Sequence, residues 1–325
     1  MVLLFLLFGG EMKMVWLILL SLLLLFFFLI LFWIYEQAFW GSKKRCSEDL
    51  GLPPGKEYDP YRAELQKNVL AMQQHAFAVW QIKANDGVSL SARYYENVPG
   101  APVIILVHGY KSSSFRDASG GFHMVRKLGF NSLVVDLRAH GESGGHTISF
   151  GIKEKEDLIL WAEEVQKRLG RETPVAFSGI SMGAATALMA GGDARLPDCV
   201  KCIVADCPYS SPEEILRSEL KKRHLPEFVY PLMRISARLI GRFDPSSDSP
   251  MAALDRCPIP VLLIHGMADD FVPFSMSKRM AEKTKKEDLI FFPVAGAGHG
   301  LSIYLAPEEY VKTYCDFMAK HLRQK

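Results

Sequence analysis

The chain has 325 residues, of which 49% are hydrophobic and 23% charged, and its formal net charge at pH 7 is +2. This length and composition allow a large buried core and exclude a disordered or fibrous chain. The basic surplus belongs to residues 1–45, and the rest of the chain has no net formal charge. Because nucleic-acid binding needs a clustered basic face, the composition gives no support for a nucleic-acid partner.

An apolar segment near the N-terminus predicts a membrane-spanning helix. Residues 15–35, VWLILLSLLLLFFFLILFWIY, contain no charged side chain, and a helix of this length covers roughly 30 Å, the thickness of the hydrocarbon core of a bilayer. A secretory signal peptide has a shorter apolar core that ends in small residues, a pattern that this segment lacks. We therefore interpret residues 1–45 as an uncleaved anchor. Aromatic side chains at both ends of the segment suit the membrane interfaces: Trp16, Trp33, Tyr35, Phe39 and Trp40.

The basic residues around this segment predict its orientation. Lys13 precedes the segment, whereas Lys43, Lys44 and Arg45 follow it. Because basic residues are enriched on the cytoplasmic side of membrane helices, we expect a single-pass membrane protein with its C-terminal body in the cytoplasm.

The six cysteines do not form the disulfide framework of a small secreted protein in a chain of this length. Cys199 and Cys202 have the spacing of half a zinc site, but no second cysteine or histidine pair lies near them in the sequence. We therefore expect buried free thiols, which suit a reducing compartment, and no metal.

The order of the remaining segments predicts the fold. Residues 46–74 are polar and partly helical, and we interpret them as a connector to a body at residues 75–325. Two β-rich runs, residues 77–84 and 88–95, flank an Asn-Asp-Gly turn and predict a hairpin. Farther on, apolar runs alternate with helical stretches, which predicts a doubly wound, mostly parallel α/β sheet led by an antiparallel hairpin. The apolar runs are PVIILVHG, SLVVDLR, PVAFSGI, CIVADC, PVLLIHG and LIFFPVAG.

One insertion interrupts this alternation. About fifty residues separate the run that ends at Cys207 from the run that begins near Val261. We expect residues 210–250 to form a helical cap over the ends of the strands. Its apolar side chains are candidates for an acyl-binding wall: Phe228, Tyr230, Leu232, Met233, Ile235 and Leu239.

Two pentapeptides fit the G-x-S-x-G pattern, in which a sharp turn between a strand and a helix exposes a nucleophilic serine. Residues 179–183 follow the run PVAFSGI without a gap and precede a stretch of small helix-forming residues. Residues 141–145 lie beyond the end of their strand, and no helical stretch follows directly. The context therefore favours Ser181 over Ser143 as the nucleophile.

A serine hydroxyl needs a base that removes its proton and a third group that orients this base. His299, in VAGAGHG after the last apolar run, has the best position for the base. Asp269 follows the run PVLLIHG and gives the order serine, acid, histidine along the chain. We favour Asp269 as the acid and interpret Asp270 as a loop charge. Asp206, which ends the preceding strand, stays an alternative.

Attack on a carbonyl group produces an oxyanion, which backbone amides must stabilise. The amide of Met182 is one candidate, because the first amides of a helix have no partner within it. The second candidate is the amide of Tyr110, in the loop after PVIILVHG. The Tyr110 side chain could instead line the pocket.

Four motifs resemble the α/β-hydrolase superfamily over about residues 75–322. The second motif has Ala139 in place of the usual glycine, and the resemblance implies that Ser143 is structural. Within the superfamily, the chain resembles the serine aminopeptidase S33-like, monoglyceride-lipase-like branch, and especially membrane-tethered bacterial hydrolases. This resemblance implies a triad of Ser181, Asp269 and His299 and no cofactor. The motifs are HGY at His108, DLRAHGESGG from Asp136, GISMG around Ser181, and HGMADDFVP followed by GHG at His299.

These features predict a membrane-anchored serine hydrolase that cleaves a carboxylic ester or thioester through an acyl-enzyme. The anchor and the apolar cap favour a small or amphiphilic acyl substrate. A serine aminopeptidase-like peptidase is one alternative, and a membrane-tethered binding protein without catalysis is another. The competent residues at all three triad positions disfavour the binding protein. A peptidase would need acidic cap residues that face the pocket, and the candidates are Glu213, Glu214, Glu219 and Glu227.

Overall fold

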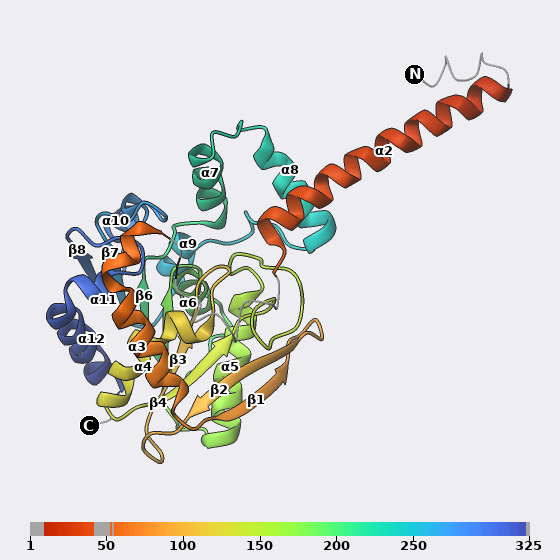
Figure 1. Cartoon of the computed structure of the whole chain (residues 1–325). Coiled ribbons are helices and arrows are strands. Elements are labelled where there is room, and N and C mark those ends of the chain that lie inside the picture. Colours follow the sequence, from red (N-terminus) through yellow and green to blue (C-terminus); the bar gives the residue numbers. More distant parts are fainter. Residues whose placement is uncertain (1–9, 42–52, 54, 323–325) are drawn as a thin grey trace.

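The computed structural model describes residues 10–41, 53 and 55–322, and it contains one eight-stranded sheet in the order β1-β2-β4-β3-β5-β6-β7-β8 (Figure 1). Strand β2 pairs antiparallel with both β1 and β4, and all the other pairs are parallel. The predicted hairpin and the mostly parallel α/β sheet are thus confirmed. The strands are β1 (Ala78–Lys83), β2 (Ser89–Tyr95), β3 (Val103–Val107), β4 (Asn131–Asp136), β5 (Val175–Ile180), β6 (Val200–Asp206), β7 (Val261–Gly266) and β8 (Leu289–Val294).

Helices cover both faces of this sheet, which explains why the central strands are apolar along their whole length. In β3, Ile105 belongs to a core shared with α5, α6, α9 and α10, whereas its neighbour Ile104 belongs to a core shared with α3, α4 and α12. The helices of the two layers are α3 (Arg62–Gln73), α4 (Ser114–Lys127), α5 (Glu154–Leu169), α6 (Met182–Gly191), α9 (Pro250–Arg256), α10 (Phe274–Lys283) and α12 (Pro307–Leu322).

The N-terminal apolar segment forms α2 (Gly10–Phe39), which contains the predicted residues 15–35. Within the described part of the chain, it is the one helix that is long and apolar enough to cross a membrane. Most of its side chains up to Leu29 are exposed, but its C-terminal part packs on the body. From the sequence, we expect Tyr35 and Phe39 at the membrane interface. Both are buried in this packed part and contact protein instead.

The insertion between β6 and β7 is helical, as predicted. It contains α7 (Pro212–Lys222), α8 (Val229–Ser236) and the short π-helix η3 (Ala237–Gly241), which we call the cap. In Figure 1, α2 crosses α8 and then extends away from the body, and α2 contacts both α8 and η3.

The predicted connector is partly described. Its C-terminal part forms the 3-10 helix η2 (Lys56–Tyr61) and α3, and α3 packs along α4. These helices therefore belong to the folded body. Cys46 and the three basic residues at positions 43–45 lie outside the described residues.

Candidate active site

Ser181 occupies a sharp turn between β5 and α6. Its φ and ψ angles are 55° and −121°, a conformation that L-residues rarely adopt and that tends to occur at functional sites. The flanking glycines allow this turn. A Cβ on Gly179 would lie 2.4 Å from the backbone of Gly183, and a Cβ on Gly183 would lie 2.2 Å from the carbonyl oxygen of Val107.

The competing serine has a different environment. Ser143 is fully buried, accepts a hydrogen bond from the backbone amide of Ser91 at 2.9 Å and donates one to the carbonyl oxygen of Asp136 at 2.6 Å. The hydroxyl thus joins β2 to the end of β4. Ser143 is a structural residue of this turn and is not accessible to a substrate.

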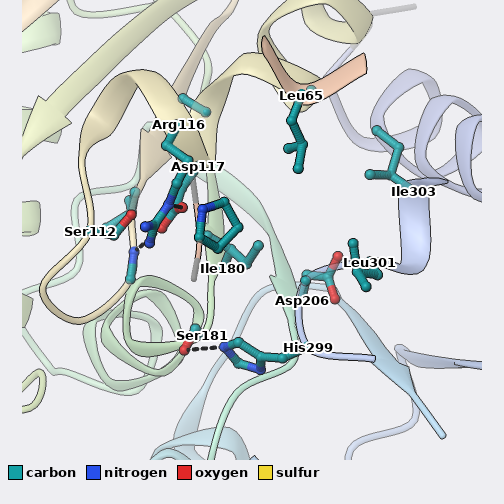
Figure 2. Close-up of a pocket in the computed structure, with 18 of the residues that line it drawn as sticks. Leu65, Ser112, Arg116, Asp117, Ile180, Ser181, Asp206, His299, Leu301 and Ile303 are labelled. Atoms are coloured by element: carbon teal, nitrogen blue, oxygen red, sulfur yellow. Dashed lines mark hydrogen bonds and ion pairs between the residues drawn. The ribbon is translucent and has the colours of Figure 1, made fainter. Parts of the chain in front are cut away.

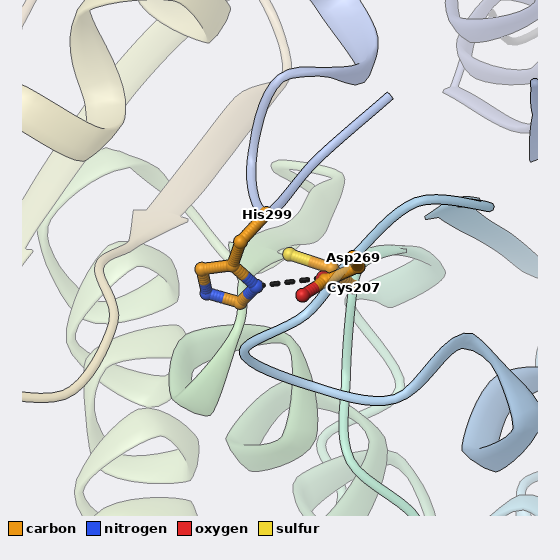
Figure 3. A group of neighbouring side chains, drawn as sticks. All are labelled: Cys207, Asp269 and His299. Carbon is orange, nitrogen blue, oxygen red and sulfur yellow. Dashed lines mark hydrogen bonds and ion pairs between the residues drawn. The ribbon is translucent and has the colours of Figure 1, made fainter. Parts of the chain in front are cut away.

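Ser181, His299 and Asp269 form one hydrogen-bonded line. Figure 2 shows the bond between Ser181 and His299, and Figure 3 shows the bond between His299 and Asp269. Nε2 of His299 lies 3.0 Å from Oγ of Ser181, and Nδ1 of His299 lies 2.7 Å from Oδ2 of Asp269. The second oxygen of Asp269 accepts the backbone amides of Phe271 and Val272 at 2.9 and 2.8 Å. The three side chains have the geometry of a base positioned between a nucleophile and an orienting acid.

The surroundings of Asp269 keep it ionised. Burial alone would raise the pKa of the Asp269 carboxyl group. The charge of His299, together with the hydrogen bonds that Asp269 makes to His265 and His299, lowers this pKa below its ordinary value. A carboxylate that stays charged can hold Nδ1 of His299 protonated, so that Nε2 is free to accept the serine proton.

Asp206, the alternative acid, has another partner. Its side chain accepts a hydrogen bond from the Tyr310 hydroxyl at 3.0 Å, and its carbonyl oxygen accepts the amide of Ser181 at 2.8 Å. Burial raises the pKa of Asp206 to about 6. Asp270 is exposed. Of the three candidate carboxylates, Asp269 is the one that the structure brings into contact with His299.

His265 is a part of this site that sequence reasoning missed. It is fully buried at the end of β7, and its Nε2 lies 3.2 Å from Oδ2 of Asp269 and 3.0 Å from the carbonyl oxygen of Val272. Its Nδ1 lies 2.7 Å from the hydroxyl of Ser277. The signal was available, because His265 ends the apolar run that precedes Asp269 by only a few residues.

The two amides proposed for the oxyanion lie on adjoining segments. Met182 is the first residue of α6, and Tyr110 follows β3. In the Tyr110 loop, the amide of Gly109 donates to Oδ2 of Asp117 at 2.8 Å, and the amide of Lys111 donates to Nε2 of His140 at 3.0 Å. These bonds fix the backbone on both sides of Tyr110.

The last turn of α2 supports the same loop. The Tyr110 hydroxyl donates to the carbonyl oxygen of Ala38 at 2.7 Å, and Nζ of Lys111 donates to that of Gln37 at 2.9 Å. The Tyr110 ring stacks on Phe150 at 5.0 Å, and Phe150 also meets Phe39 of α2 edge to face. The apolar helix is therefore part of the packing behind the Tyr110 loop.

A cavity of about 1010 Å³ opens beside Ser181 and His299. Its walls come from the connector, α4 and the segment after His299, as the labelled Leu65, Arg116 and Ile303 show in Figure 2. The expectation that the cap forms an acyl-binding wall is wrong. None of the six apolar candidates, all of them described residues, lines this cavity. Tyr230 and Met233 are buried, Leu232 is partly buried against the core, and Phe228, Ile235 and Leu239 are exposed. Helix α8 packs against α2. The four acidic cap residues do not line it either.

Tyr58 of the connector was also missed. Its hydroxyl donates to the backbone carbonyl oxygen of His299 at 3.0 Å, and its side chain lines the cavity. Burial raises the pKa of Tyr58 above its ordinary value, so the phenol keeps the proton that it donates. The connector looks in sequence like an ordinary polar linker, and no local pattern indicates this contact.

Cys207, together with Asp269 and His299, places three donor atoms at the separations of a metal site. Cys207 Sγ, a carboxylate oxygen of Asp269 and a ring nitrogen of His299 lie within 4.8 Å of one another (Figure 3). A cysteine binds a metal ion as its thiolate. Burial and the nearby carboxylates of Asp206 and Asp269 raise the pKa of the Cys207 thiol well above its ordinary value and so disfavour the thiolate. His299 and Asp269 already bind each other. The chemistry fits a neutral thiol packed beside the hydrogen-bonded Asp269 and His299 better than a metal centre.

Comparisons with known proteins identify the family of this chain. The model of the Alpha/beta hydrolase family matches residues 104–313. The chain belongs to the alpha/beta hydrolase family. It is similar to YqkD of Bacillus subtilis (strain 168), an uncharacterised protein, with 32% identity over 217 residues, 66% of this chain and 70% of YqkD. It is also similar to ABHD12B of Homo sapiens, with 29% identity over 235 residues, 68% of this hydrolase and 61% of ABHD12B.

Solved structures show the same fold. The hydrolase superposes on the esterase Pf2001 of Pyrococcus furiosus with a TM-score of 0.64 and 24% identity, over 78% of this chain and 96% of Pf2001. At this identity the match establishes the fold and leaves the substrate of this hydrolase open.

Proposed function

We propose that this chain is a membrane-anchored serine hydrolase that cleaves an ester-type substrate, a carboxylic ester or a thioester. The observation that carries the proposal is the hydrogen-bonded line from Ser181 Oγ through His299 to Asp269, which opens on the cavity. The esterase fold of Pf2001 supports the reaction type. We place the chain in the S33-like branch on the motifs of its sequence.

The proposed reaction follows from the atoms at hand. His299 Nε2 removes the proton of Ser181 Oγ as the oxygen attacks the substrate carbonyl carbon, and Asp269 stabilises the imidazolium that forms. The amides of Tyr110 and Met182 bind the oxyanion. His299 then protonates the leaving alcohol or thiol, and an acyl-enzyme remains on Ser181. Water attacks this ester with His299 as the base and releases the acid.

The walls of the cavity support an acyl substrate. Leu65, Ile180, Leu301 and Ile303 line it with apolar surface, and the described walls also contain charged groups such as Arg116 and Asp117. Such a mixture suits an ester with an apolar chain and a polar end. The peptidase alternative loses its main support, since the acidic cap residues are not at the cavity.

The location follows from α2 and its flanking charges. The helix is long and apolar enough to span a bilayer, and most of its surface up to Leu29 is exposed. We propose that α2 is an uncleaved single-pass anchor and that the body lies on the cytoplasmic side, where the basic residues 43–45 would be retained.

A substrate panel on the full-length protein in detergent tests this function. We expect hydrolysis of short- and medium-chain acyl esters, little hydrolysis of aminoacyl amides, and loss of both activities in Ser181→Ala. Preferred cleavage of the amides would indicate a peptidase. Ester hydrolysis that persists in a folded Ser181→Ala variant would contradict the proposed mechanism.

A further inference from the structure

The cap has an exposed apolar stripe that the active site does not use. Phe228, Ile235 and Leu239 share one helical face and form this stripe, and Leu232 between them is partly buried against the core. Phe228 and Leu239 expose 68% and 65% of their surface, and Ile235 exposes 38%. None of these residues lines the described cavity.

The stripe is not needed for the packing of α8 either. The opposite face of the same helix provides the buried contacts, through Tyr230, Met233 and Ser236. A surface helix normally places polar residues opposite its buried face, whereas this one places large apolar side chains there. Large exposed apolar side chains that cluster on one face indicate an interaction surface.

The stripe continues the surface of α2. Helix α2 contacts both α8 and η3, and its residues Leu31 and Ile34 are buried. Leu29 and Leu25 precede these buried residues in α2, and each exposes 54% of its surface. Figure 1 shows α8 beside the point where α2 leaves the body. The apolar faces of the cap and of α2 therefore adjoin.

The charges next to the stripe suit an anionic surface. Lys221, at the end of α7, is exposed and has no anionic partner among the described residues, whereas its neighbour Arg223 lines the cavity. The acidic residues on either side in sequence are paired elsewhere, Glu219 with Lys222 at 3.1 Å and Glu227 with Arg217 at 2.8 Å. Basic residues that border an apolar helix face favour contact with anionic lipid headgroups.

We propose that the cap is a second membrane-contact element. Its stripe inserts into the interfacial layer of the same bilayer that α2 spans, with Lys221 at the headgroups. This proposal rests on the proposed membrane anchoring by α2. Because the cap and the last turn of α2 both adjoin the catalytic body, the contact holds that body against the lipid surface and favours acyl esters that reside in the bilayer.

Depth-dependent quenching tests the contact in the full-length protein. The protein is reconstituted into phosphatidylcholine and phosphatidylglycerol vesicles with a fluorescent amino acid at position 228 or 239. Lipids with a quencher near the headgroup report the cap contact, and lipids with a quencher deep in the acyl chain report position 22 of α2. Position 22 in α2 is the positive control, and position 79 on the edge strand β1, where Val79 is 58% exposed, is the negative control.

We expect blue-shifted emission and quenching at positions 228 and 239, and neither effect at position 79. Equal, water-like emission at 228, 239 and 79, together with quenching at 22, would overturn the cap contact and leave the anchor intact. Loss of quenching at 22 would instead contradict the anchor. A blue shift at position 228 that disappears when the protein is diluted in the membrane would overturn the proposal and indicate contact between two copies of the chain.

A functional measurement complements the quenching. The double variant Phe228→Ser, Leu239→Ser should hydrolyse a vesicle-embedded ester more slowly than the unchanged protein and a soluble ester equally fast. Val79→Ser is the matched control and should change neither rate. An unchanged ratio of the two rates in the double variant would contradict a role of the stripe at the membrane.

Discussion

At the scale of residues, the two buried carboxylates near His299 differ in what they contact. Asp269 bonds to the imidazole, whereas Asp206 bonds to Tyr310. We expect Asp269→Asn to lower kcat by about 10³- to 10⁴-fold, because an amide no longer stabilises the imidazolium and can select the wrong histidine tautomer. Steady-state kinetics measure this loss, with the circular dichroism spectrum as the check of folding.

The matched variant is Asp206→Asn, which removes a carboxylate at a similar depth without touching the hydrogen bond to His299. We expect it to retain most of the activity. If Asp206→Asn abolished turnover and Asp269→Asn did not, the acid of the triad would be Asp206.

Asp206 also has a measurable effect on stability. Burial raises its pKa to about 6 in the folded protein, so the native state binds more protons than the unfolded chain between about pH 4 and pH 6. This group therefore stabilises the fold at low pH, and its contribution is lost as the pH rises through about 6. Between pH 8 and pH 5 it should add about 1 kcal/mol, a gain that Asp206→Asn lacks. Denaturant unfolding of both proteins at the two pH values checks this, and an identical pH dependence would contradict it.

The turn at Ser181 depends on the absence of a side chain at Gly183. A Cβ there would lie 2.2 Å from the carbonyl oxygen of Val107, which belongs to the neighbouring strand and cannot move freely. We expect Gly183→Ala to lower the melting temperature strongly and to abolish activity. Gly121→Ala is the control, because its Cβ would meet only Leu106, at 3.8 Å. This variant should gain up to about 1 kcal/mol of helix stability in α4. Equal melting temperatures for the two variants would show that the close approach at Gly183 is not real.

At the scale of elements, α2 has two parts with different environments. Phe39 is fully buried between Phe150 and Phe243, with edge-to-face contacts at 5.9 and 5.3 Å, whereas Phe26 is 61% exposed. We expect Phe39→Ala to destabilise the body by roughly 3 kcal/mol and to lower kcat, because Phe150 also supports Tyr110. Phe26→Ala should change neither property. Thermal unfolding in detergent compares the two variants, and equal melting temperatures would mean that α2 is a detachable tether.

The sequence predicted the elements that carry local signals. The apolar runs became strands, the Asn-Asp-Gly turn joined a hairpin, and the residues around Ser181 formed the strand-turn-helix that their glycines indicate. The contacts of Tyr58 and Phe39 could not be predicted, since each depends on where a distant segment packs. The cap failed for a similar reason: its apolar residues do not specify whether they face the cavity, α2 or the exterior.

At the scale of the whole molecule, α2, the cap and the α/β body form one connected unit. The last turn of α2 bonds to the loop of Tyr110, and the connector bonds to the backbone of His299. Both ends of the active site are thus held by segments that lie outside the predicted body. This arrangement explains why the full-length protein, and not the isolated body, is the appropriate material for activity measurements.

Covalent labelling of the full-length protein tests the central proposal most directly. A fluorophosphonate reacts with a serine only when a neighbouring base activates it, so mass spectrometry of the labelled protein locates the nucleophile. We expect one adduct on Ser181, none on Ser143, and much slower labelling in Asp269→Asn. An enzyme that is folded and hydrolyses esters, yet has no adduct on Ser181, would contradict the account.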